Sequence, residues 1–232
     1  MSILSPDYDM LNEISEILDE VNADYSNYLD HNHDIDDIDF LAELLNEKTQ
    51  FTGLPIRWVN QDNNRANPNE WISASASTGP DGNSIAVILW HNNLENKWGP
   101  QTFKELVLKM LSHETIHFEQ YNRIGLNQIL GIESGSQKGQ KLKAKTGKDR
   151  DYQRSYLRDS HELMAYGHDL SEEIKLSTNP EKALRNPEAF IEELPVYNQY
   201  RKIFPINAKP LKKLLSYAAR YTNAIHSENV HI

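Results

Sequence analysis

The sequence predicts an α+β fold that is mostly helical and contains a small antiparallel sheet. Apolar residues recur at helical spacing near the N-terminus, around residues 102–122 and in the last third of the chain. Short β-like runs are confined to residues 55–90. The chain has 232 residues, which is ample for a hydrophobic core.

Two amphipathic helices are expected first. Apolar residues at helical spacing define one from Met10 to Val21 and another from Ile35 to Leu45. Residues 1–48 hold 14 acidic side chains and one lysine, a balance of −13, whereas the whole chain carries −10. We expect these residues to form an acidic helical arm packed on a body of residues 49–232, so that the two parts make one compact unit. The arm is either a solvated helical face or a segment that binds a partner or shields a cleft, and it argues against nucleic-acid binding.

Three strands should follow, over Pro55–Asn60, Trp71–Ser77 and Ser84–Trp90. Stretches rich in Asn, Asp and Gly separate them, which is typical of turns in an antiparallel sheet. The third strand leads by a short link into the next helix. It is either an exposed strand that can pair with an extended peptide or a buried central strand.

The next helix, about Thr102 to Asn122, contains the run His113-Glu114-Thr115-Ile116-His117. Positions i and i+4 lie one turn apart on one helix face, so both imidazoles can reach one metal ion. Glu114 lies about 100° round the helix, within reach of a water that the metal activates. The alternative is a core helix with two hydrogen-bonded histidines.

The C-terminal half is expected to be helical with one long loop. Residues 131–150 are rich in glycine and basic side chains, which indicates a mobile surface loop or lid. A helix should span Tyr152–Leu176. Prolines then divide the chain into short pieces before a final helix from Leu211 to Ile225.

The composition restricts the chemistry. The chain contains no cysteine, so a zinc site must use histidine and carboxylate ligands. No apolar run approaches the roughly 18 residues that span a bilayer, and the N-terminus lacks the features of a secretion signal. We therefore expect a cytoplasmic protein that binds no membrane.

A zinc ion held by two histidines needs a third protein ligand and an open position. A third histidine six residues beyond the motif is excluded because position 123 is Arg123. The ligand should come from a later helix, and the run HELMAYGHD offers His161, Glu162 and His168.

These residues resemble the gluzincin class of zinc metallopeptidases, in which a glutamate on the following helix completes HExxH. The resemblance implies a zincin-like fold and Zn²⁺ held by His113, His117 and Glu162. The run YLRDSHELMAYGHDL is also similar to uncharacterised HExxH proteins encoded by bacteriophages, which implies a location in the host cytoplasm or the virion. The similarity covers about residues 84–225.

The chain departs from the class at Tyr166, where many gluzincins place an aspartate that orients a histidine ligand. Asp169 or Asp159, on the same helical face as Glu162, could take that part. Glu162 is preferred over His161 as the ligand.

The expected function is hydrolysis of peptide bonds in a peptide or protein substrate. Glu114 would be the general base towards water activated by zinc. Candidate oxyanion donors are His168, Tyr166, Tyr156 and Tyr121. One alternative is a non-catalytic zinc protein that acts as an interaction module or virion component, with a zinc site closed by a fourth ligand from His168 or His161. Another is a regulatory peptidase that docks one partner through its acidic arm.

Overall fold

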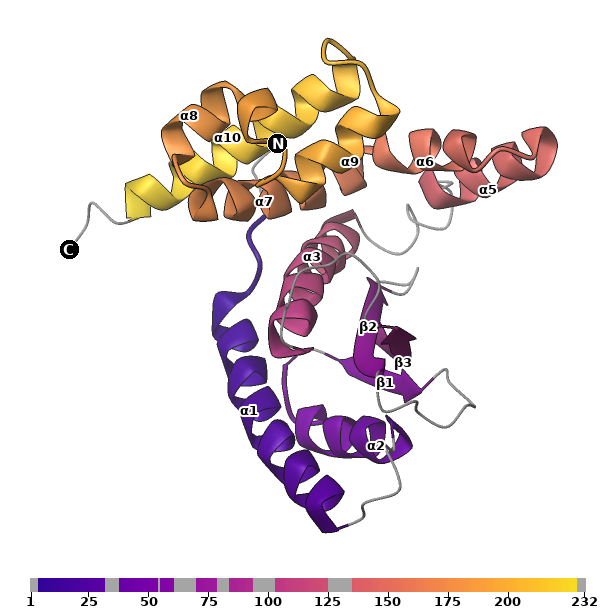
Figure 1. Cartoon of the computed structure of the whole chain (residues 1–232), viewed down its shortest axis with the longest axis vertical. Helices are drawn as coiled ribbons and strands as arrows, with labels where there is room; N and C mark the ends of the chain where they lie inside the picture. Colours follow the sequence, from indigo (N-terminus) through magenta and orange to yellow (C-terminus); the bar gives the residue numbers. More distant parts are fainter. Residues whose placement is uncertain are drawn as a thin grey trace. The chain divides into compact units, whose positions relative to one another are not determined.

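A computed structural model describes residues 4–31, 38–53, 55–60, 70–78, 84–93, 103–124 and 135–228. The chain divides into two compact units (Figure 1). The first, called the sheet unit, spans residues 6–126. The second, called the helical unit, comprises residues 1–5 and 127–232. The α+β fold class is confirmed, and most of the described residues are helical.

The sheet unit contains, in chain order, α1 Tyr8–His31, α2 Ile38–Thr49, β1 Ile56–Asn60, β2 Glu70–Thr78, β3 Ile85–Asn93 and α3 Phe103–Ile124. The strand order is β1-β3-β2, so the apolar strand β3 is central. β3 pairs antiparallel with β2, and in the register Thr78 lies opposite Ile85 and Glu70 lies opposite Asn93. The expected strand positions are therefore confirmed to within a few residues, and β3 is the buried central strand.

The prediction of a wholly antiparallel sheet is wrong for β1, which pairs parallel with β3. Alternation of apolar and polar residues determines which side chains share a face of a sheet. It does not determine which strands are neighbours or the direction in which they run. The chain places β2 between β1 and β3 in sequence, whereas the sheet places β3 between the other two.

The core of the sheet unit joins both N-terminal helices to the sheet and to α3. Ile14, Leu45, Val87 and Leu111 are fully buried members of this core. Both α1 and α2 therefore share their core with the sheet. The Asn46 side chain ties α2 to β1 by donating to the carbonyl oxygen of Trp58 (2.8 Å) and accepting from its amide (3.0 Å). The acidic face of α1 also contacts α3 through Asp19 and Lys104.

The helical unit contains α5 Gly135–Thr146, α6 Asp149–Leu157, α7 Ser160–Leu176, α8 Pro180–Arg185, the 3-10 helix η1 Pro187–Phe190, α9 Pro195–Ile203 and α10 Lys209–Glu228. Proline begins α8, η1 and α9, where its missing N–H costs no helical hydrogen bond. Helix α7 packs closely against α10 at Gly167. A Cβ there would lie 2.4 Å from Cβ of Tyr217, so only glycine permits this approach.

The prediction of a loop over residues 131–150 is wrong from residue 135 onwards, and residues 131–134 lie outside the described part. Residues 135–146 form α5, since lysine, glutamine, leucine and alanine are good helix formers. Gly139 lies against α6, where a Cβ would be 2.8 Å from Cδ2 of Tyr152. This glycine marks a close helix contact and not a loop.

The expected single helix over residues 152–176 is two helices, α6 and α7. Asp159 separates them with an extended backbone and caps α7 by accepting a hydrogen bond from the amide of His161 (3.0 Å). No helix among the described residues is both long and apolar enough to cross a membrane.

Candidate metal centre

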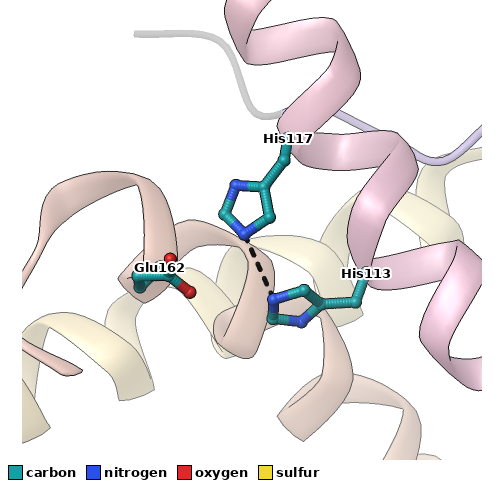
Figure 2. Close-up of side chains that lie close together, drawn as sticks. All are labelled: His113, His117 and Glu162. Carbon is teal, nitrogen blue, oxygen red and sulfur yellow. Dashed lines mark hydrogen bonds between the residues drawn. The ribbon is translucent and has the colours of Figure 1, made fainter. Parts of the chain in front are cut away.

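The two histidines of the motif lie on consecutive turns of α3 and point their Nε2 atoms at one another (Figure 2). The Nε2 atoms of His113 and His117 are 3.2 Å apart, and both side chains are buried. Two nitrogens bound tetrahedrally to zinc at 2.0–2.1 Å lie about 3.3 Å apart. The observed separation matches that of two ligands of one zinc ion, and it equally matches the hydrogen bond between the two histidines that the alternative expects (Figure 2).

Gln120 orients the second histidine. Its Oε1 atom lies 2.9 Å from Nδ1 of His117, and Gln120 is itself buried. An amide oxygen only accepts hydrogen bonds, so Nδ1 of His117 carries the proton and Nε2 keeps its lone pair. Sequence reasoning gave Gln120 no role. Its position three residues after His117, on the same helix face, is the signal that could have revealed it.

Glu114 is held by the last residue of β2. The Thr78 amide and hydroxyl donate to Oε2 of Glu114 at 2.6 and 2.7 Å. The same hydroxyl lies 2.9 Å from the backbone oxygen of Glu114, so its single proton is shared between this oxygen and Oε2. Thr78 is 36 residues from Glu114, and no sequence pattern links the two. Its contact was not predicted.

Glu162 lies in the first turn of α7, the turn that Asp159 caps. The Tyr156 side chain lies beside its carboxylate. Burial, followed by the neighbouring Tyr166 and Glu162, raises the pKa of Tyr156 well above its ordinary value. Tyr156 therefore keeps its hydroxyl proton beside Glu162 at alkaline as well as neutral pH. This position beside Glu162 differs from the role of oxyanion donor that was considered for Tyr156 above.

His113, His117 and Glu162 form a group that could hold a metal ion. Each offers one ligand atom, and these atoms all lie within 4.8 Å of one another (Figure 2). The alternative ligands His161 and His168 are not members of this group. The group thus contains the two histidines and the glutamate expected from the sequence.

The predicted oxyanion donors on α7 have defined surroundings within the helical unit. His168 is buried against the ring of Tyr221 (5.2 Å between centroids), with Asp169 and Glu172 each 3.7 Å from one of its nitrogens. The half-buried Tyr166 packs edge-on against the rings of Tyr156 and Tyr200. Catalytic roles for His168 and Tyr166 stay predictions.

Asp159 and Asp169, which were expected to orient a histidine ligand, also have partners of their own. Asp159 serves as the cap of α7, and Asp169 lies beside His168. Gln120 is an acceptor beside one of the motif histidines, His117. Tyr121, half-buried on α3, stays a candidate oxyanion donor.

Comparisons with protein-family models, with curated proteins and with solved structures found no match to this chain. The functional interpretation therefore depends on the chemistry of these side chains.

Proposed function

We propose that the protein is a zinc-dependent metallopeptidase in which His113, His117 and Glu162 hold the ion. Glu114 is the general base. The observation that carries the proposal is the grouping of these three ligand atoms within 4.8 Å of one another, with Glu114 in the same motif as the two histidines.

The donor set favours zinc over other common ions. Two imidazoles and one carboxylate are the ligands of many catalytic zinc sites, which keep a further position open. Calcium and magnesium prefer sites made wholly of oxygen atoms. The buried Nε2 atoms of His113 and His117, at a separation that matches tetrahedral zinc, support the same choice.

Zinc in such a site acts as a Lewis acid and lowers the pKa of water to about 7. The side chains of the chain supply the remaining chemistry. Glu114 takes a proton from the attacking water and returns it to the leaving amine. Gln120 keeps the lone pair of His117 directed at the ion, and Tyr156 lies beside the carboxylate of Glu162. Tyr166 and His168 are the proposed donors to the oxyanion.

The test compares wild-type protein with Glu114→Gln and with Glu119→Gln, a control on the same helix. Glu119 is half-buried and forms an ion pair with Arg123 (3.7 Å). Zinc content and cleavage of a quenched fluorescent peptide library are measured for each. We expect all three proteins to bind zinc, and Glu114→Gln alone to lose activity by about 100-fold or more.

Two results would overturn the proposal. A zinc-loaded wild-type protein that cleaves no peptide or protein would indicate the non-catalytic zinc protein instead. Full activity of Glu114→Gln with zinc bound would remove Glu114 from the mechanism.

A further inference from the structure

The end of β2 contacts α3 at Glu114, the side chain that the proposed mechanism uses as its base. β2 is an edge strand, and Thr78 is its last residue (Figure 1). Thr78 pairs with Ile85 of β3 on one side and turns its amide towards Glu114 of α3. Both partners belong to the sheet unit.

The two oxygens of the Glu114 carboxylate are treated differently. Oε2 accepts two hydrogen bonds from Thr78, one from the amide and one from the hydroxyl. Oε1 accepts none from the described residues. Because Oε2 is fixed by two donors, the carboxylate cannot rotate freely about its last bond, and the direction of Oε1 is set.

Orientation of this kind has an energetic consequence. A half-exposed glutamate side chain loses rotamer freedom when it is held in one geometry. Thr78 brings about this loss in the folded protein, before any substrate binds, so it need not occur during the reaction. If the Thr78 hydroxyl served only to end β2, it would not need the charged carboxylate of Glu114 as its acceptor.

We propose that Thr78 is a positioning residue that holds Oε2 of Glu114 so that Oε1 carries the proton. This inference rests on the proposed peptidase function. The O–H bond of water breaks as its proton moves to Oε1. The water oxygen forms the bond to the carbonyl carbon while the π pair of the C=O bond moves to the carbonyl oxygen. The C=O double bond then forms again as the C–N bond breaks, and the proton leaves Oε1 for the amine nitrogen, which regenerates the carboxylate.

The first test uses Thr78→Val, which removes the hydroxyl at nearly constant volume, and Thr78→Ser, which keeps it. Ser77→Ala, at an exposed position of the same strand, is the control. We expect unchanged zinc content in all variants and about a tenfold fall in kcat at unchanged KM for Thr78→Val. Thr78→Ser and Ser77→Ala should match the wild type. In a Glu114→Gln background, Thr78→Val should cause no further loss.

A second readout is independent of activity. Hydrogen exchange of the Thr78 amide, followed by NMR, should be faster by about tenfold or more in Glu114→Ala than in the wild type, because the acceptor is gone. An unchanged Thr78 amide would overturn the contact itself.

The outcomes separate the two proposals. An active wild type with an equally active Thr78→Val would overturn the role of Thr78 and leave the peptidase function standing. A zinc-loaded wild type without peptidase activity would overturn the function, and with it the role of Thr78.

Discussion

Oε1 of Gln120 lies 2.9 Å from Nδ1 of His117, one turn further along α3. The amide oxygen fixes both the tautomer and the orientation of the imidazole. Gln120→Ala should therefore weaken zinc binding by 10- to 100-fold, about the usual effect of losing such a partner. Gln120→Glu keeps an acceptor at the same place and should bind zinc at least as tightly as the wild type. Competition with a chromophoric chelator measures both, and equal affinities for wild type and Gln120→Ala would contradict this role.

Asp159 caps the helix that presents Glu162. Asp159→Ala leaves the amide of His161 without its acceptor and should lower the free energy of unfolding by about 1 kcal/mol. Because Glu162 lies in the first turn, loosening of that turn should also weaken zinc binding. Asp159→Asn retains a capping oxygen and should preserve both properties. Urea unfolding and zinc titration of the two variants check the prediction, which fails if alanine and asparagine behave alike.

Two buried tyrosines of α9 should respond in opposite ways to removal of the hydroxyl. The hydroxyl of Tyr200 has no hydrogen-bond partner among the described residues, whereas Tyr197 donates to Glu188 (3.3 Å). Tyr200→Phe should raise the free energy of unfolding by about 1 kcal/mol, since an unsatisfied buried hydroxyl is removed. Tyr197→Phe should lower it by a similar amount. Urea denaturation at neutral pH compares the two, and a destabilised Tyr200→Phe would show that this hydroxyl has a partner.

Alkaline pH should destabilise the fold through Tyr200. Burial, followed by the nearby Tyr166, Glu162 and other acidic groups, raises its pKa well above the ordinary value. The folded protein therefore keeps this proton above about pH 10, where the unfolded chain releases it. The contribution is fully present below pH 10 and is lost as the pH rises beyond it, at about 1.4 kcal/mol per pH unit.

The measurement is urea unfolding between pH 9 and 11 for wild type and Tyr200→Phe. The fall in stability above about pH 10 should be less steep in the variant. Identical slopes would mean that Tyr200 ionises equally in the folded and unfolded states.

Local patterns in the sequence were enough to predict most helices, the strand positions and the pairing of His113 with His117, whereas they left Glu162 as one of three possible third ligands. His113 and His117 are related by helix geometry alone, and the capping signal at Asp159 is followed three residues later by Glu162. That signal also marks the break between α6 and α7, which apolar periodicity by itself did not reveal.

Features that depend on distant residues were not predictable in the same way. The direction of β1 depends on its neighbour in the sheet, which no pattern within β1 identifies. The bond from Thr78 to Glu114 joins residues 36 positions apart. Gly139 was expected to lie in a loop. A glycine is required there because its backbone lies against Tyr152 of the next helix, which the local sequence does not reveal.

The most direct test of the proposed zinc site is the zinc content and affinity of the wild type beside Glu162→Gln. The controls are Glu172→Gln, at a half-buried position of the same helix outside the metal group, and His161→Ala, at the alternative ligand. We predict about one zinc per chain in the wild type and both controls, and binding weaker by about 100-fold or more in Glu162→Gln. Absence of zinc from the wild type after zinc is supplied, or equal binding by Glu162→Gln, would contradict the site.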